Sequence, residues 1–425
     1  MKNDAKRTKE PLFHLVKRTN VPMWQACLIR VGAILVGLLV IMLLCLISLD
    51  ANPGFVFKFM LKGAFGVGEK TKLMKYKTLS LMRDLAILLL FALAVTPAFK
   101  MKFWNIGAEG QVLIAALSSM VCIFYLGGKV NNVLLIFICL VAAVTGGVIW
   151  AVIPALFKAK WNTNETLFTL MMNYVAIELI VFMIKVWVPS GSQSLPPSQY
   201  ANLPKIGGDD FWFSIIVALV ATAFMFTYLR FTKHGYEISV VGESEKTARY
   251  IGINVKKVIL RTLLVSGIIC GITGFLLVNG KNHTVSDTSA GGRGFTAILV
   301  SWLAKFNPLF MILTAFLVVF LEKGTEGVMD ELDITNDFFS QVLIGVMFLL
   351  IIACEFFINY KVVFRHRAAS APTQGAPALE EGEEAKAFSE ELDPDPIVEA
   401  SGPFLSEGAM ADAEISQADV SAKEE

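Results

Sequence analysis

The chain has 425 residues, of which 55% are hydrophobic and 17% are charged, with a formal net charge of +1 at pH 7. Soluble domains average about 45–50% apolar and about 25% charged residues, so the composition argues against a water-soluble protein. The near-zero net charge gives no argument for nucleic-acid binding, and six scattered cysteines without a C-x-x-C pair imply neither a disulfide framework nor a metal site.

Apolar runs follow one another along most of the chain. A helix needs about 20 apolar residues to cross a bilayer, and eight runs approach or reach that length: 28–49, 81–99, 107–127, 133–156, 166–188, 211–231, 258–279 and 338–359. The first run follows a basic segment, 1–27, but it is longer than a signal-peptide core, so we expect a retained span. These runs predict an all-α integral membrane protein, a polytopic helix bundle of about eight spans.

The stretch 291–322 is too long for one plain span and is interrupted by Lys305, Asn307 and Pro308. Proline removes a backbone donor and disfavours helix at the residue before it. We therefore predict a broken re-entrant pair of half-helices, 293–304 and 308–322. A single kinked and tilted helix is the alternative.

Basic residues between the spans predict the orientation, because cytoplasmic loops are enriched in Lys and Arg. With a cytoplasmic N-terminus, the loops 100–102, 157–160 and 230–257 are also cytoplasmic, whereas the acidic loop 323–337 is outside. Residues 50–80 are an exception, because they are predicted to lie outside yet carry six lysines. The permease domain spans 28–360, and the acidic residues 361–425 are expected to form a disordered cytoplasmic tail.

Polar residues interrupt the apolar pattern in "FWNIGAEGQ" (103–111), which contains Asn105, Glu109 and Gln111. Asn105 could cap a helix that starts near Ile106, and Glu109 would then lie in a first turn that favours negative charge. Alternatively, the three polar side chains line a pathway inside the bundle, since ionisable residues in membrane segments are usually functional. The residues alone leave both interpretations open.

A second polar opening, "WNTNETLFTLMMNYVAIELIVF" (161–182), has Thr163 or Asn164 as a possible cap and Glu165 in the first turn. Thr166, Thr169 and Asn173 follow on one helical face, and we expect Glu178 to be buried near the same face. This polar stripe either holds helices together or lines a route for a polar solute.

The segment 230–257 is predicted to contain a short helix capped by Ser244, running to about Ile251 and ended by Gly252. It is too short and too polar to span a membrane. It either lies at the lipid interface or docks a soluble partner.

Together these stretches resemble the permease subunits of ABC importers in the simple-sugar, nucleoside and branched-chain amino acid group. "FWNIGAEGQ" looks like the group's F-N-I-G-A-E-G-Q signature, and "NETLFTLMMNYVA" (164–176) looks like its N-E-x-x-x-T-L-M-x-N-Y stretch, which is most similar to nucleoside (guanosine-type) permeases. "HGYEISVVGESEKTARYIGI" (234–253) and "GFTAILVSWLAKFNPL" (294–309) resemble two further motifs of the group.

The resemblance implies a multi-pass transport subunit of a bacterial cell membrane with no ATPase site or cofactor of its own. Its expected partners are a cytoplasmic ATP-binding cassette subunit, which binds the ATP, a second permease subunit, an external substrate-binding lipoprotein and membrane lipid, without nucleic acid. Five residues carry over to ATPase coupling: Gly242, Ala248, Arg249, Tyr250 and Gly252. Four carry over to the solute pathway or its scaffold: Asn105, Glu109, Gln111 and Asn173.

The predicted function is the import of nucleosides by alternating access. A simple-sugar or branched-chain amino acid permease is the alternative within the group, and an ion-coupled secondary transporter with broken helices at midplane is the alternative outside it. A membrane enzyme or scaffold is disfavoured, because the sequence has no G-x-S-x-G, Walker A or metal-binding motif.

Overall fold

The computed structural model describes residues 53–188 and 194–332 continuously, together with strands 13–17 and 360–364 and scattered helical positions within 32–46 and 342–356. Within this part, seven helices are long and apolar enough to cross a membrane. Apart from these scattered positions, the predicted spans 28–49 and 338–359 lie outside the described residues. So do most of the N-terminal segment 1–27 and nearly all of the tail 361–425.

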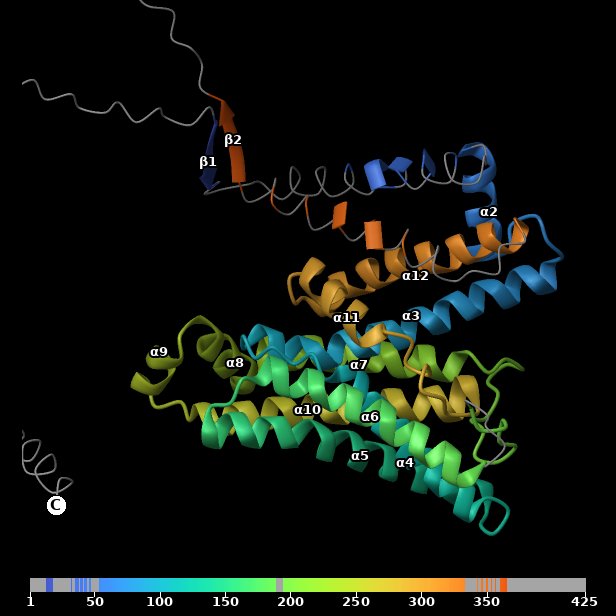
Figure 1. Ribbon diagram of the computed structural model, residues 1–425, viewed down its shortest axis with the longest axis horizontal. Coiled ribbons are helices and arrows are strands. Elements are labelled where there is room, and N and C mark those ends of the chain that lie inside the picture. The colour runs from blue at the N-terminus through green and yellow to red at the C-terminus, as the bar shows by residue number, and fades with distance from the viewer. Residues whose placement is uncertain are drawn as a thin grey trace, which may run out of the picture. The chain divides into compact units, whose positions relative to one another are not determined.

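The described chain is mainly helical (Figure 1). Six predicted spans are confirmed as α3 (Thr71–Lys100), α4 (Ala108–Leu126), α5 (Asn132–Trp161), α6 (Glu165–Trp187), α7 (Trp212–Phe231) and α10 (Val255–Leu276), the last continued by the π-helical turn η1 (Leu277–Asn282). The remaining helices are α2 (Pro53–Phe65), α8 (Lys233–Glu243), α9 (Glu245–Tyr250), α11 (Arg293–Leu303) and α12 (Pro308–Glu331). Two strands that we did not predict, β1 (Phe13–Lys17) and β2 (Tyr360–Phe364), form a two-stranded sheet.

Helix α10 packs against α3, α4 and α5. Its glycines allow close approach to α5, because a β-carbon at Gly267 would lie 2.8 Å from the Cα of Val148, and one at Gly271 would be similarly crowded by Val144. Small residues at crossings are typical of membrane bundles, in which association depends on close packing. The spacing of these contacts makes α5 and α10 antiparallel.

The predicted break in 291–322 is confirmed. Lys305 and Phe306 both have positive φ, Asn307 caps α12 by accepting a hydrogen bond from the Leu309 amide at 3.1 Å, and Pro308 occupies the first turn. However, α12 continues to Glu331, so residues 323–331, predicted as part of an outside loop, are helical. With 24 residues, α12 is long enough to cross a bilayer by itself and is therefore more than a half-helix.

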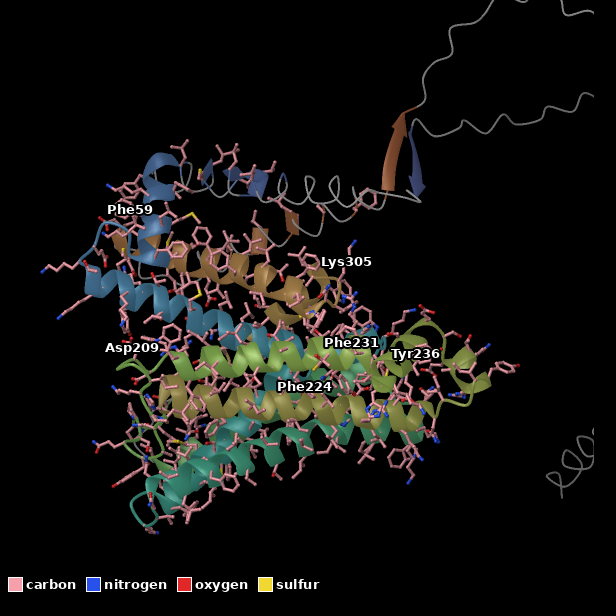
Figure 2. All side chains as sticks on the ribbon, turned by 180° about the vertical axis from the view of Figure 1, so that it is seen from behind. Phe59, Asp209, Phe224, Phe231, Tyr236 and Lys305 are labelled. Carbon is pink, nitrogen blue, oxygen red and sulfur yellow. The ribbon has the colours of Figure 1, made fainter. Side chains whose placement is uncertain are left out.

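The three loops predicted to share the cytoplasmic side lie at one end of the bundle. Gly242 of α8 packs on the backbone of Lys100, and the antiparallel pairing of α5 with α10 brings the end of α5 to the same side. Asp209 and Phe59 lie at the opposite end from Tyr236 (Figure 2).

Three of the six lysines in the segment 50–80 form ion pairs with acidic residues. Lys62 pairs with Glu331 at 2.8 Å, Lys75 with Asp209 at 2.7 Å and Lys77 with Glu69 at 3.1 Å. The Lys62–Glu331 pair therefore brings the lysine-rich segment together with the acidic segment predicted to lie outside, at the end opposite α9. Their charges partly cancel there, which the count of lysines alone did not anticipate.

Candidate functional site

Asn105 lies at the start of α4 and is completely buried. Its Oδ1 accepts hydrogen bonds from the Gly107 amide at 3.1 Å and from Nε2 of Gln111 at 3.2 Å, while its Nδ2 donates to Oγ of Ser266 at 3.4 Å. The predicted cap at Asn105 is wrong in position, because α4 starts at Ala108 with Gly107 as its N-cap. Asn105 instead satisfies the amide of Gly107 and joins the loop before α4 to α10.

Asn173 of α6 binds both this loop and the first turn of α4. Its Oδ1 accepts from the Gly110 amide at 2.8 Å, and its Nδ2 donates to the carbonyl of Ile106 at 3.0 Å. Position 110 needs glycine, because a β-carbon there would lie 2.9 Å from Oδ1 of Asn173. The polar stripe on α6 thus holds two helices together.

Glu109 of α4 forms hydrogen bonds with the start of another helix, α11. The amide of Gly292 donates to Oε1 at 2.8 Å and the amide of Gly294 donates to Oε2 at 2.6 Å. The first amides of a helix have no partner within it and carry partial positive charge, so a carboxylate from α4 caps α11. Gly291 and Gly292 both have positive φ, which allows the chain to turn into this cap.

The structure brings the four predicted pathway residues together, and each of Asn105, Glu109, Gln111 and Asn173 is at most 6% exposed. Each forms a hydrogen bond with a backbone group or with another member of the group. Glu178, in contrast, was wrongly expected to be buried. It lies on the exposed face of α6, because the buried face of that helix contacts α4.

A second group of ionisable residues was not predicted, and we call it the Asp84 cluster: Asp84, Lys281, Arg293, Glu322, Lys323 and Glu326. Asp84, in α3, is buried, and Nζ of Lys281 lies 2.7 Å from its Oδ1. A signal was present, because Asp84 is an acid within the apolar run 81–99, where a charge is costly unless it is paired. Its partners Lys281, Arg293 and Lys323 are distant in sequence, and no local pattern indicated that they contact Asp84.

The predicted coupling helix is present as α9. Oγ of Ser244 accepts from the Thr247 amide at 3.2 Å, and Gly252 has a φ of +83° just beyond the end of the helix. Ala248 is buried, whereas Tyr250 is 92% exposed. The five predicted coupling residues therefore divide into three that position the segment (Gly242, Ala248 and Gly252) and two that it presents to solvent (Arg249 and Tyr250).

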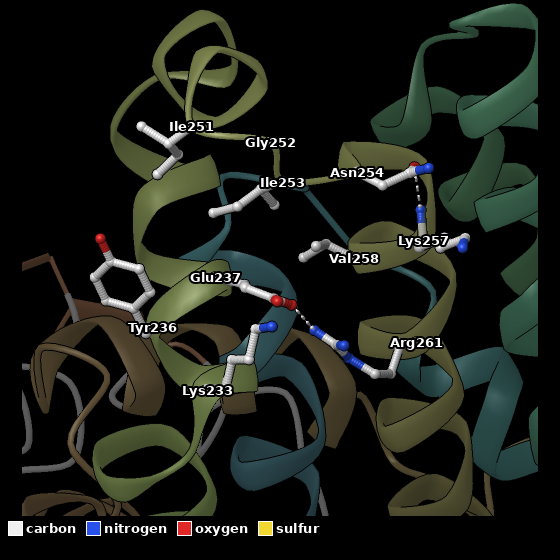
Figure 3. A pocket seen from close by; sticks show the side chains of 10 residues that line it. All are labelled: Lys233, Tyr236, Glu237, Ile251, Gly252, Ile253, Asn254, Lys257, Val258 and Arg261. Carbon is white, nitrogen blue, oxygen red and sulfur yellow. Dashed lines mark hydrogen bonds and ion pairs between the residues drawn. The ribbon is translucent and has the colours of Figure 1, made fainter.

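A pocket of about 570 Å³ opens beside α9, between α8 and the start of α10 (Figure 3). Its lining includes Lys233, Lys257 and Arg261, and Glu237 pairs with Arg261 at 2.6 Å. Tyr236, Ile251 and Ile253 provide an apolar part of the wall. The pocket is therefore basic on balance, with an apolar rim.

These features define a polytopic α-helical membrane protein with a polar, glycine-rich junction inside the bundle and a short capped helix at one end. Comparison with known proteins identifies the family within this class. Residues 77–352 match a family described as "Branched-chain amino acid transport system / permease component". The match covers more than half of the chain, and the chain belongs to this family.

Three similar proteins are named as subunits of transporters. The glucose ABC transporter permease protein TsgB13 of Haloferax volcanii is 28% identical over 85% of this chain and 96% of the relative. The guanosine ABC transporter permease protein NupP of Bacillus subtilis is 25% identical over 66% of this chain and 81% of the relative. The nucleoside ABC transporter permease protein NupB of Lactococcus lactis is 25% identical over 66% and 79%. The chain is thus an ABC transporter permease and a multi-pass protein of the cell membrane.

Proposed function

We propose that this permease works in an importer driven by a cytoplasmic ATP-binding cassette subunit, which binds and hydrolyses the ATP. The observation that carries the proposal is α9, a capped helix that presents Arg249 and Tyr250 to solvent beside the basic pocket. An aromatic side chain that is 92% exposed, next to an arginine, has the composition of an interface centre.

The other proposed partners are a second permease subunit and an external substrate-binding lipoprotein. Alternating access requires that ATP and solute bind two states of the assembly with different affinity. Since α9 is joined to α10 by only a few residues, a force on α9 would reach the bundle through α10. Buried Ala248 and the contact of Gly242 with Lys100 support this coupling.

The proposed solutes are nucleosides. The resemblance of residues 164–176 to nucleoside permeases and the names of NupP and NupB support this class. A simple sugar is the second candidate, because the relative TsgB13 is named as a glucose permease and matches over more of the chain.

The outward face of α6 is a candidate wall of the solute pathway. Tyr174 and Phe182 are 59% and 60% exposed and lie one turn before and one turn after Glu178. At 1.5 Å per residue, Glu178 is about 20 Å from the start of a helix about 35 Å long, which places it close to mid-depth. A charge at that depth costs at least about 2.5 kcal/mol when it faces lipid, so we infer that this face meets water or the second permease.

Under this proposal, Glu178→Leu lowers solute uptake while yield and thermal stability stay unchanged. The matched control is Leu179→Ala, a change at the neighbouring position, which should have little effect on uptake. Normal uptake by Glu178→Leu would assign this face to lipid.

The function is tested by reconstitution in proteoliposomes with the ATPase, the second permease and the receptor. We expect ATP-dependent accumulation of labelled guanosine that excess unlabelled guanosine suppresses and excess glucose does not. Suppression by glucose alone would favour the sugar candidate. Accumulation of solute against a gradient by the chain alone would identify a secondary transporter and contradict the proposal.

A further inference from the structure

The Asp84 cluster joins four elements of the membrane domain, α3, η1, α11 and α12. Oδ1 of Asp84 in α3 pairs with Nζ of Lys281 in η1 at 2.7 Å. Its Oδ2 faces Nη2 of Arg293 in α11 at 3.8 Å and Nζ of Lys323 in α12 at 3.6 Å. One buried carboxylate thus faces cations from three different elements.

The two cations of the α11–α12 pair also have acidic partners within that pair. Nη2 of Arg293 lies 3.6 Å from Oε1 of Glu322, and Nζ of Lys323 lies 2.6 Å from Oε2 of Glu326. Three cations therefore share three carboxylates. Within the cluster the charges balance, and the neighbouring Arg83 lies over the ring of Phe211 at 4.7 Å instead.

The same balance allows the cluster to divide into three separate ion pairs. Asp84 with Lys281 belongs to α3 and η1, whereas Arg293 with Glu322 and Lys323 with Glu326 belong to α11 and α12. The contacts of Asp84 with Arg293 at 3.8 Å and with Lys323 at 3.6 Å connect these groups. If the α11–α12 pair pivoted about the Glu109 cap on Gly292 and Gly294, Arg293 and Lys323 could leave Asp84 without any of these charges losing its partner. A buried charge left without a partner is the costly outcome.

A further polar contact between α3 and this pair, made by Thr96, can also be replaced by one within α3. Oγ1 of Thr96 lies 2.9 Å from Oγ of Ser301 and 3.5 Å from Sδ of Met311. Thr96 also donates to the carbonyl of Ala92 in its own helix, so its hydroxyl keeps a partner if the pair moves.

We propose that Asp84 is a positioning residue that holds the α11–α12 pair against α3 in one state of the transport cycle. In the other state Arg293 and Lys323 leave Asp84 and remain paired with Glu322 and Glu326. The proposal rests on the function proposed above, because it assigns this exchange to the alternating-access step.

Two substitutions test the proposal with opposite expected signs. Asp84→Asn removes the carboxylate that holds the pair, so the assembled importer should hydrolyse ATP several-fold faster without solute and import several-fold less solute per ATP. Glu322→Gln removes the partner to which Arg293 is released, so basal ATP hydrolysis should fall below the wild-type rate. A cluster that only stabilises the fold would give both variants the same sign, as lower yield with normal solute imported per ATP, and that result would overturn the proposal.

A distance measurement tests the role of Asp84 independently of whether the protein imports solute with ATP. Nitroxide labels at Lys72→Cys and Asp330→Cys, both exposed and outside the cluster, report the position of α12 relative to α3 in full-length protein lacking its native cysteines. We expect a broader distance distribution in Asp84→Asn and a narrower one in Glu322→Gln, whether or not ATP drives transport. Identical distributions in wild type and both variants would overturn the proposal even if uptake is ATP-driven.

Control variants distinguish a loss of coupling from a loss of folding. Asp84→Glu keeps the charge and should restore most of the coupling. Asp209→Asn removes an ion pair of similar length, Lys75–Asp209, in an outer loop and should leave ATP hydrolysis and label distances unchanged. If Asp84→Asn fails to fold, the charge-balanced double variant Asp84→Asn/Lys281→Gln should show the same uncoupling, and wild-type coupling in that variant would contradict the proposal.

Discussion

Individual polar side chains join helices of this membrane domain at defined backbone groups. Asn173 binds one amide and one carbonyl of the segment entering α4, and Glu109 binds two amides of α11. A buried backbone group without a partner costs about 1–3 kcal/mol. The positions of α4, α6 and α11 therefore depend on a few specific hydrogen bonds as well as on apolar packing.

Asn173→Ala should lower the free energy of unfolding by about 2–4 kcal/mol, because the Gly110 amide and the Ile106 carbonyl both lose their partner. Denaturant titration in detergent, followed by tryptophan fluorescence, measures this change. Asn202→Ala removes a side chain that donates one long hydrogen bond of 3.4 Å at the surface, and its effect should be small. An equal effect of the two substitutions would contradict the role given to Asn173.

Glu109→Gln should impair uptake more than expression, because the amide keeps one acceptor oxygen for two converging N–H groups and loses the charge that favours a helix N-terminus. Uptake per folded molecule is the measurement. Glu165→Gln is a matched control, since Glu165 is also a first-turn glutamate but pairs with the side chain of Lys158 at 2.9 Å. Normal uptake by Glu109→Gln would show that its cap on α11 is dispensable.

The sequence identified these polar residues but not their partners. A first-turn glutamate and a capping asparagine are local signals, so Glu109 and Asn105 could be selected from residues 103–111 alone. The contact of Glu109 with Gly292 and Gly294 joins positions more than 180 residues apart, and no local pattern encodes it. For the same reason Asp84 was overlooked, because its role depends on cations from η1, α11 and α12.

Whole elements were more predictable than single contacts. The cap at Ser244, the stop at Gly252 and the break before Pro308 rest on local backbone chemistry, and the structure confirms them. The end of α12 was predicted too early, at 322. Acidic residues predicted an outside loop there, but Glu331 of α12 pairs with Lys62 of α2, and Glu326 pairs with Lys323 within α12.

At the scale of one element, Arg249→Glu should reduce co-purification of the ATPase without changing the yield of the permease. Arg249 is exposed, and its contact with Glu245 at 3.5 Å is a weak surface pair, so folding does not depend on it. Lys205→Glu makes the same change of charge in an exposed loop at the opposite end and should leave co-purification unchanged. Unchanged co-purification by Arg249→Glu would count against α9 as the docking element.

At the scale of the whole molecule, the chain has a membrane domain with different chemistry at its two ends. One end carries α9 and a basic pocket, and the other carries lysines paired with acids from later segments. Composition and run length predicted the class of fold, because apolar length is a direct requirement of the bilayer. They did not predict how the charges at each end are paired, since pairing depends on tertiary contacts.

Deleting residues 370–425 should leave transport intact, because this acidic segment has a composition that cannot bury enough apolar surface to form a core. Initial uptake rates of the full-length and shortened permeases, each assembled with the same partners, provide the measurement. Abolished transport would assign the segment a necessary role.

The pairing of Lys62 with Glu331, across 269 positions of sequence, has a consequence for biosynthesis. The lysines of α2 and early α3 leave the ribosome long before Asp209 and Glu331 have been translated. During that interval their charge opposes the export that the predicted orientation demands. Lys75 and Lys62 therefore gain these acidic partners only after residues 209 and 331 have been translated.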